Sequence, residues 1–333
     1  TRMNLDNIAY TLTVGRKQFV RRGFALLDDL SGAAEALSNA GERLIDASAM
    51  PEEREIAFMF AGGGAQYPNM GRGLYDTEPV YRDAVDESLA LISEFIDYDL
   101  KALLFPDPES IDQAAQELEK PSRTLPALFI TQYAQAQLWQ SWGVSPSAMI
   151  GHSMGENTAA CVAGVLSLKD ALGLVALRGR LFDSIPHSGM LSVQLGEEDL
   201  KPLLGDLDIA AVNAEGLSVA SGNIDALEEL EKKLDACEAS YQRVHINIAA
   251  HSRMLDGILK EFGDYLRSIT LNKPSIPFLS NLSGDWISDE QATDPEYWVA
   301  HLRNTVRFAD GAAKLLQDNT YVLLEVGAGK TLT

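Results

Sequence analysis

The sequence has little cysteine, few basic residues and no long hydrophobic run. Its two cysteines, Cys161 and Cys237, are too few for a disulfide framework or a zinc site, so we expect no metal and a reduced, cytoplasmic setting. Because no stretch of about 18 apolar residues occurs, we expect no membrane span. No signal peptide is visible, and the sequence opens with Thr1 in place of Met, which we interpret as a piece of a longer polypeptide.

Basic residues are outnumbered by acidic ones. Lysine and arginine total 27 against 48 aspartates and glutamates, which gives a net charge of −21. Nucleic acids and anionic membranes bind basic surfaces, so we expect neither as a partner. Fixed-period repeats and low-complexity tracts are also missing. Hydrophobic residues still make up 46% of the chain, which suffices for a full core in one large unit or two to three smaller ones.

The hydrophobic pattern divides the chain into three parts. Residues 1–50 predict a small α+β unit, and a polar joint follows it. Residues 51–189 and 249–333 together predict a large α/β body, whose unbroken apolar runs are typical of a buried parallel sheet. Residues 190–248 interrupt this body with the order β-α-β-β-α-β, which is the ferredoxin-like arrangement.

The segment Gly151-His152-Ser153-Met154-Gly155 has the G-x-S-x-G form of a nucleophile elbow. A short strand is predicted before it at 148–150, and a helix after it at 156–163, which is the context that an elbow requires. The glycines permit a sharp turn that holds the Ser153 hydroxyl exposed. The alternative interpretation is a chance glycine–serine turn between a strand and a helix.

A nucleophilic serine needs a base, and the sequence contains five histidines. His152 adjoins the serine on a tight turn, where neighbouring side chains point apart, so it is a poor base. His251 lies where the predicted insert returns to the large body, and functional residues often lie on such loops. Spacing alone supports a solvated loop histidine at this position equally well.

Two other segments, a glycine run and a pair of arginines, could bind a negatively charged group. Gly62-Gly63-Gly64 follows a buried strand predicted at 56–60 and offers backbone N–H groups to an oxyanion or a phosphate, but it is equally compatible with a flexible turn. Arg178 and Arg180 lie late in a predicted helix, where a positive charge is normally solvated. We expect at most one of them to turn inward, where a planar guanidinium suits a carboxylate.

Taken together, these motifs resemble the acyltransferase domain of modular polyketide synthases and the related malonyl-CoA:acyl carrier protein transacylases. The resemblance covers the whole chain, and residues 1–50 resemble the adapter between a ketosynthase and its acyltransferase. It implies an α/β-hydrolase-like subdomain with a parallel sheet, an inserted ferredoxin-like subdomain and a small α+β linker before them. It rests on residues 60–66, 151–156, 177–179, 213, 219–222, 250–252, 298–308 and 325–329.

The resemblance implies a role for each matching residue. Ser153 would take the acyl group, and His251 would be its general base. No aspartate completes a triad in this family, so the backbone carbonyl of His301 would orient the histidine. Arg178 would hold the free carboxylate of the substrate. The other expected contacts are the backbone N–H groups of Gly63 and Met154, as the oxyanion hole, and the substrate-pocket residues Gln66, His152, Asn213, Ile248 and Ala250.

The implied reaction moves a carboxylated extender group from coenzyme A, through an acyl-serine, to the phosphopantetheine thiol of an acyl carrier protein. No bound cofactor is expected. The expected partners are that carrier protein and a ketosynthase domain in the same polypeptide. The segment Ile248-Ala249-Ala250-His251 fits neither the malonyl nor the methylmalonyl pattern of the family. Met154 is more typical of malonyl enzymes, so we favour malonyl, with methylmalonyl or another extender as the alternative.

The sequence departs from the family pattern at three positions. Gly63 replaces a glutamine, Leu125 replaces the glutamine before Pro126 and the long predicted helix at 127–142, and Thr305 replaces a proline. Two other functions remain open. A serine hydrolase or thioesterase would need an acidic residue between Ser153 and the histidine, and several are present. A spacer without activity is the third interpretation, although the intact serine, histidine and arginine argue against it.

Overall fold

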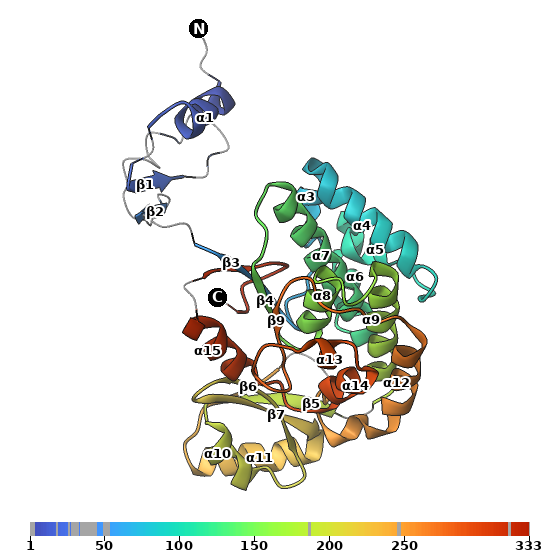
Figure 1. Ribbon diagram of the computed structural model, residues 1–333. Coiled ribbons are helices and arrows are strands. Elements are labelled where there is room, and N and C mark those ends of the chain that lie inside the picture. Colours follow the sequence, from blue (N-terminus) through green and yellow to red (C-terminus); the bar gives the residue numbers. More distant parts are fainter. Residues whose placement is uncertain are drawn as a thin grey trace. The chain divides into compact units, whose positions relative to one another are not determined.

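The computed structural model of the chain is shown in Figure 1. It describes residues 4–17, 19–25, 27, 33, 45–48, 54–185, 188–244, 248–318 and 321–332. The chain divides into two compact units, Thr1–Arg54 and Glu55–Thr333. The sequence pattern placed the first division at residue 50, just before the polar segment that leads to the second unit.

The described part of the first unit contains one helix and one antiparallel strand pair. Helix α1 spans Leu5–Val14, and Asn4 caps it by accepting a hydrogen bond from the Asp6 N–H group at 2.8 Å. Strand β1 (Arg21–Phe24) pairs with β2 (Ile45–Ser48). These elements are those of a small α+β unit.

A four-stranded parallel sheet forms the centre of the second unit. Its strands lie in the order β10-β3-β4-β9. Alternate residues of β3 face two different cores: Phe58 and Phe60 belong to the larger one, and Ala57 and Met59 to a smaller one. Because both faces are buried, the strands read as continuous apolar runs. The bounds are β3 (Ile56–Phe60), β4 (Ala148–Gly151), β9 (Phe278–Leu279) and β10 (Val322–Glu325).

The register between β3 and β4 brings the ends of both strands to one edge of the sheet. Phe60, the last residue of β3, pairs with Gly151, the last residue of β4. The carboxyl ends of two adjacent parallel strands therefore meet at one edge, where ligands bind in open α/β sheets. The glycine run at 62–64 and the predicted elbow both begin at this edge.

Helices cover the sheet, with α7, α8 and α9 beside the larger core (Figure 1). In chain order they are α3 (Arg72–Thr77), α4 (Pro79–Ile92), α5 (Leu100–Leu104), η1 (Pro108–Ser110), α6 (Ile111–Glu117), α7 (Pro121–Ser141), α8 (Met154–Val162), α9 (Leu168–Asp183), η3 (Arg253–Ile258), α12 (Leu259–Ser268), α13 (Asp289–Ala292), α14 (Pro295–Arg303) and α15 (Phe308–Asp318).

The long helix α7 begins earlier than the sequence predicted. Pro126 was placed ahead of a helix at 127–142, but it lies inside the helix. A proline has no N–H group, so the carbonyl of Ser122, four residues earlier, loses its usual partner. The hydroxyl of Tyr98 donates a hydrogen bond to that carbonyl instead. The predicted start of this helix was therefore wrong, because a tertiary contact replaces the missing backbone bond.

The antiparallel subdomain has the predicted β-α-β-β-α-β order. Its strands lie in the order β6-β7-β5-β8, all antiparallel, as a ferredoxin-like sheet requires. Buried leucines of α11, namely Leu227, Leu230 and Leu234, pack in its core. The elements are β5 (Ser188–Val193), α10 (Glu197–Leu200), η2 (Lys201–Leu203), β6 (Asp208–Ala214), β7 (Leu217–Asn223), α11 (Ile224–Ala236) and β8 (Tyr241–Arg243).

Strand β6 also bonds to the large subdomain. The N–H group of Val306 donates to the Ala210 carbonyl, and the N–H group of Val212 donates to the Val306 carbonyl, each at 2.9 Å. The Thr305 hydroxyl adds a hydrogen bond to the Ile209 carbonyl at 2.6 Å. A proline at position 305 would have no such donor, so this departure from the family pattern adds a contact between the subdomains.

Candidate active site

Ser153 occupies a strained turn between β4 and α8. Its backbone has φ 53° and ψ −113°, which few residues other than glycine adopt. The two glycines of the motif are required by close packing. A Cβ on Gly151 would lie 2.1 Å from the Glu156 nitrogen, and one on Gly155 would lie 2.0 Å from the Phe60 oxygen. The segment is therefore a nucleophile elbow, and a chance turn is excluded.

Three side chains that are distant in sequence meet at the Ser153 hydroxyl. Ser153 Oγ lies 2.6 Å from His251 Nε2 and 2.8 Å from Arg178 Nη2. The hydroxyl can donate its proton to the imidazole while it accepts a hydrogen bond from the guanidinium. His251 is 3% exposed and Arg178 is 1% exposed. The interpretation of His251 as a solvated loop residue is thereby excluded.

His251 is held in its neutral form. Burial lowers the pKa of its imidazole well below the ordinary value, and the positive charge of Arg178 lowers the pKa further. At neutral pH the unprotonated Nε2 can therefore accept a proton from Ser153. His251 also has a positive φ of 56°, so both partners of this hydrogen bond have strained backbones.

The carbonyl beside His251 is not the one that the resemblance implied. His301 lies within α14, and its ring centroid lies 6.2 Å from that of His251. The carbonyl that favours the protonated form of His251 belongs to Asn304, although Nδ1 makes no hydrogen bond of good geometry within the described residues. Asn304 follows the helix with an extended backbone, so its carbonyl is free to turn toward the ring, whereas carbonyls inside a helix point along the axis.

Arg178 is the arginine that turns inward. Its Nη1 donates to Asn157 Oδ1 at 2.9 Å, and its guanidinium lies 5.3 Å from the centre of the Phe182 ring. Burial lowers the pKa of Arg178 to about 10, so the side chain stays cationic at neutral pH. Arg180 is exposed and pairs with Glu261.

Two backbone N–H groups beside Ser153 have no acceptor among the described residues. Gly63 and Met154 both line the cavity, and neither N–H group donates a hydrogen bond to any residue that the structure describes. Met154 is the first residue of α8, where the N–H group has no acceptor within the helix and the helix dipole is positive. The arrangement suits a developing negative charge on a substrate oxygen.

Gln66 was predicted as a pocket residue, and the structure contradicts this. Its side chain does not line the cavity. Its Oε1 accepts a hydrogen bond from the Gly64 N–H group at 2.9 Å. Gln66 therefore holds the backbone of the glycine loop at Gly64.

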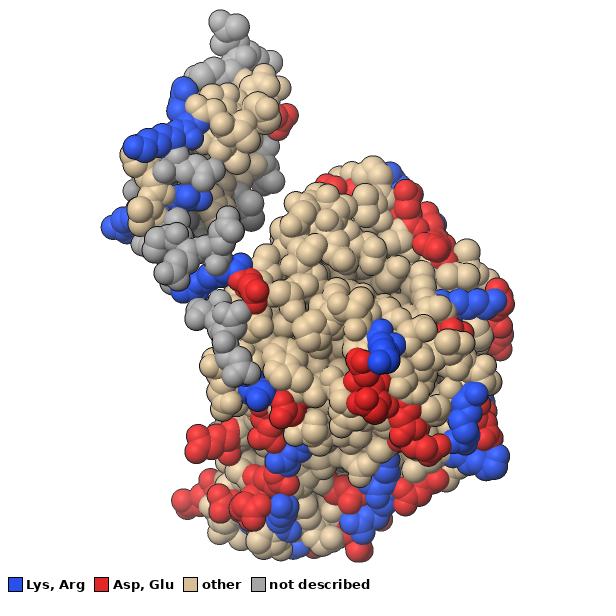
Figure 2. Space-filling view, viewed as in Figure 1, with Lys and Arg blue, Asp and Glu red and all other residues tan. Residues whose placement is uncertain are grey.

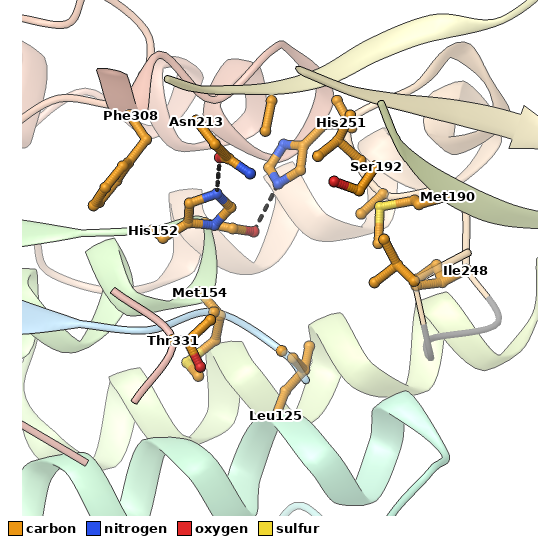
Figure 3. A pocket seen from close by; sticks show the side chains of 18 of the residues that line it. Leu125, His152, Met154, Met190, Ser192, Asn213, Ile248, His251, Phe308 and Thr331 are labelled. Atoms are coloured by element: carbon orange, nitrogen blue, oxygen red, sulfur yellow. Dashed lines mark hydrogen bonds between the residues drawn. The ribbon is translucent and has the colours of Figure 1, made fainter. Parts of the chain in front are cut away.

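The other predicted pocket residues do line a cavity of about 380 Å³. His152 Nε2 lies 2.8 Å from Asn213 Oδ1, so this histidine is bound to the ferredoxin-like subdomain (Figure 3). Ile248 and Ala250 form the wall near His251. Sequence reasoning assigned no pocket role to the other wall residues Leu125, Phe182, Met190, Ser192, Phe308 and Thr331.

A buried polar network behind the elbow was also missed. Asn281 Oδ1 accepts a hydrogen bond from the Ser153 N–H group at 2.7 Å, and Asn281 Nδ2 donates to the Gly151 carbonyl at 2.8 Å. Glu156 accepts from the Asn281 N–H group at 2.7 Å and from the Tyr297 hydroxyl at 2.5 Å. The only available sequence signal was Glu156, which directly follows the elbow motif.

The described residues offer neither a metal site nor a membrane-spanning helix. Among them, no group of three or more histidine, cysteine, aspartate or glutamate side chains could hold a metal ion. None of the helices in this part of the chain is long and apolar enough to cross a membrane. Cys161 is a buried free thiol and Cys237 an exposed one.

Comparison with known proteins decides the family. The family model described as "Acyl transferase domain" matches residues 57–333. The chain belongs to the acyltransferase domain family. This confirms the resemblance that the sequence motifs suggested, and the domain is therefore an acyltransferase.

Individual relatives refine this identification of the acyltransferase domain. A phenolphthiocerol/phthiocerol polyketide synthase polypeptide of Mycobacterium tuberculosis is 36% identical over 343 aligned positions, which cover 99% of this chain but only 23% of the relative. The acyltransferase domain of SpnD, solved with 2-(pent-4-yn-1-yl)malonyl, is 39% identical, with a TM-score of 0.89 over 99% of this chain and 78% of that one.

A more distant structure is that of a malonyl CoA-acyl carrier protein transacylase. The malonyl CoA-acyl carrier protein transacylase of Clostridium perfringens is 26% identical, with a TM-score of 0.74 over 84% of this chain and 88% of that one. The domain is therefore of the modular polyketide synthase type and is related to these transacylases. The predicted α/β fold, with a parallel sheet and an antiparallel subdomain, is confirmed.

Proposed function

We propose that this acyltransferase domain moves a carboxylated extender group, with malonyl favoured, from coenzyme A to the phosphopantetheine thiol of an acyl carrier protein in polyketide biosynthesis. The observation that carries the proposal is the position of Ser153 Oγ between His251 Nε2 and Arg178 Nη2. A nucleophile next to both a neutral base and a buried cation suits a thioester whose acyl group ends in a carboxylate.

In the first half-reaction, Ser153 Oγ attacks the thioester carbonyl while its proton passes to His251 Nε2. The carbonyl oxygen becomes an oxyanion and accepts hydrogen bonds from the N–H groups of Met154 and Gly63. Each such donor is worth about 3 kcal/mol in comparable sites. The carbon–sulfur bond then breaks, His251 returns the proton to the departing coenzyme A thiolate, and an ester on Ser153 remains.

The second half-reaction reverses these roles with a different thiol. His251 takes the proton of the phosphopantetheine thiol, and the sulfur attacks the acyl-Ser153 ester. The tetrahedral intermediate uses the same two N–H groups, and Ser153 leaves with the proton from His251. Both halves need only groups of this chain and the two thiols, so the proposal includes no bound cofactor.

Arg178 supplies selectivity for the acyl group. A carboxylate at the far end of the acyl chain can replace Ser153 as acceptor for the Nη2 group and can also reach the unpartnered Nε. An uncharged acyl group would leave these buried donors without a partner, which is costly. The malonyl derivative in the SpnD structure supports a carboxylated substrate. Met154 and the similarity to a malonyl CoA-acyl carrier protein transacylase support malonyl over methylmalonyl.

Hydrolysis by a Ser–His–acid triad is less well supported. No carboxylate contacts His251 Nδ1 among the residues that the structure describes. The buried carboxylate of Glu156 is instead bonded to Asn281 and Tyr297, behind the elbow. A hydrolase also needs an ordered attacking water, whereas most of the cavity wall is apolar.

The proposed partners are the carrier protein and, through residues 1–50, a ketosynthase domain of the same polypeptide in the cytoplasm. The chain has a net charge of −21. On the face of the second unit shown in Figure 2, acidic and basic side chains are interspersed and form no continuous basic area among the described residues. Because carrier proteins are typically acidic in this family, we propose that covalent tethering supplies the effective concentration for transfer.

The test is a competition among malonyl-, methylmalonyl- and acetyl-CoA. Intact-protein mass spectrometry identifies which adduct forms on Ser153, and a carrier protein is then added. We expect a malonyl adduct that moves to the carrier protein faster than it hydrolyses. A dominant methylmalonyl adduct would show that the extender is methylmalonyl and not malonyl. Hydrolysis without transfer would favour the thioesterase alternative.

A further inference from the structure

The guanidinium of Arg178 is buried yet contacts no carboxylate among the described residues. Its Nη2 donates to Ser153 Oγ at 2.8 Å and its Nη1 donates to Asn157 Oδ1 at 2.9 Å. Its Nε has no partner in the same part of the chain. Buried charges are normally paired with an opposite charge, so the neutral surroundings of this side chain need a reason.

The carboxylate of Glu156 supplies a compensating negative charge but does not contact the guanidinium. Glu156 favours the charged form of Arg178 through its electrostatic field. Its two carboxylate oxygens are bonded elsewhere, Oε1 to the Tyr297 hydroxyl and Oε2 to the Asn281 N–H group. The protein thereby stabilises the cation from a distance without filling its hydrogen-bonding positions.

Asn157 is placed to fix the guanidinium. It lies in the first turns of α8, which begins directly after Ser153, and Arg178 donates hydrogen bonds to both side chains. Asn157 is 1% exposed. Phe182 lies four residues after Arg178 in α9 and supports the guanidinium with its ring. The side chain is thus held by an amide on one helix and a ring on the other.

We propose that Asn157 is a positioning residue that determines acyl specificity, because its neutral amide fixes Arg178 while leaving the positive charge for the carboxylate of the substrate. A carboxylate at position 157 would form an ion pair with the guanidinium and neutralise it. An apolar side chain would leave Nη1 without an acceptor and let the guanidinium move. This inference rests on the proposed function of Arg178.

The test measures acylation of Ser153 by malonyl-CoA and by acetyl-CoA in Asn157→Asp and Asn157→Leu. Leucine has the same branched outline as asparagine, so it tests the loss of the acceptor if the aspartate variant does not fold. We expect the malonyl-to-acetyl ratio of kcat/KM to fall by about tenfold or more in each variant, as for a lost hydrogen bond to a charged group. The loss should appear in KM for malonyl-CoA, with acetyl transfer retained.

Thr158→Val is the matched control. Thr158 is the next residue of α8, is fully buried and bonds to Gln132, away from Arg178. This variant loses a buried hydrogen bond of the same helix, so it reports any general effect on α8. Its ratio of kcat/KM for malonyl-CoA to kcat/KM for acetyl-CoA should equal that of the unmodified domain.

Comparison with Arg178→Ala distinguishes an error in the role of Arg178 from an error in the role of Asn157. If Arg178→Ala slows malonyl and acetyl transfer equally, the assigned role of Arg178 is wrong, and the role of Asn157 is overturned with it. If Arg178→Ala discriminates but the folded Asn157 variants keep the original ratio, only the inference on Asn157 is overturned.

Discussion

Ser153 Oγ and His251 Nε2 lie 2.6 Å apart, although 98 positions separate the two residues in the chain. Both residues have positive φ angles, 53° and 56°. Such strain persists only where the surrounding structure fixes it. Here Asn281 holds the Ser153 backbone, and the ordered end of α14 lies against His251. The site is therefore organised before any substrate binds.

Replacing Ser153 with alanine should abolish the acyl-enzyme. The variant removes the oxygen that lies between His251 and Arg178, and it keeps the backbone N–H groups of the proposed oxyanion hole. We expect no acyl adduct on the protein after exposure to malonyl-CoA, measured by intact mass. Persistent labelling would place the nucleophile elsewhere in the chain.

Replacing Arg178 with alanine should separate carboxylated from uncharged substrates. The variant removes hydrogen bonds to a charged group, each worth about 1.5–3 kcal/mol. We therefore expect kcat/KM for malonyl-CoA to fall by roughly tenfold to a hundredfold, with a much smaller loss for acetyl-CoA. Competitive acylation assays with the two thioesters measure this. An equal loss for both would remove Arg178 from the carboxylate role.

Residues of the site differ in how far they could be predicted from sequence. Ser153 was predictable because the elbow is local: strand, turn and helix are contiguous. His251 was predictable only through the family resemblance, since spacing left a loop histidine equally plausible. The resemblance assigned the orienting carbonyl to His301, whereas the carbonyl that acts on the pKa of His251 belongs to Asn304, past the end of α14. Sequence spacing does not resolve a difference of three residues where the group required is a single carbonyl.

The network behind the elbow could not be predicted. Asn281 reaches Ser153 across 128 positions and Tyr297 reaches Glu156 across 141. Asn281 is positioned by β9, which pairs with β4 and is only two residues long. So short a strand has no periodicity to detect. The fold class, by contrast, was predictable, because β3 and β4 are buried on both faces and the antiparallel subdomain has amphipathic elements of ordinary length.

The pH dependence of acylation should follow His251. Burial and the Arg178 charge place the pKa of His251 well below its ordinary value of 6.5. Because the neutral form is the base, kcat/KM should be constant at neutral pH and fall only as the pH drops through this lowered pKa. A rate profile for formation of acyl-Ser153 measures it. An inflection at or above pH 6.5 would show that the free enzyme holds a more basic histidine than its burial implies.

Replacing Tyr297 with phenylalanine should damage both stability and chemistry. The Tyr297 hydroxyl donates to the buried Glu156 carboxylate at 2.5 Å and lies 2.7 Å from Ser280 Oγ. Its loss leaves a buried carboxylate with fewer donors, which costs about 1–3 kcal/mol of unfolding free energy. Because Glu156 also holds Asn281, which bonds the Ser153 backbone, we expect kcat to fall while KM stays nearly constant. Thermal melts and acylation kinetics measure the two effects.

Tyr265→Phe is the control for this prediction. Tyr265 donates a hydrogen bond to the Asp170 carbonyl at 2.9 Å and is half-buried, outside the network around Glu156. Its removal should lower stability without changing kcat. If Tyr297→Phe melts earlier than the unmodified domain but acylates Ser153 at the same rate, the network serves only the fold. If kcat falls in Tyr297→Phe alone, the contacts behind the elbow set the position of the nucleophile, because the two variants lose the same chemical group.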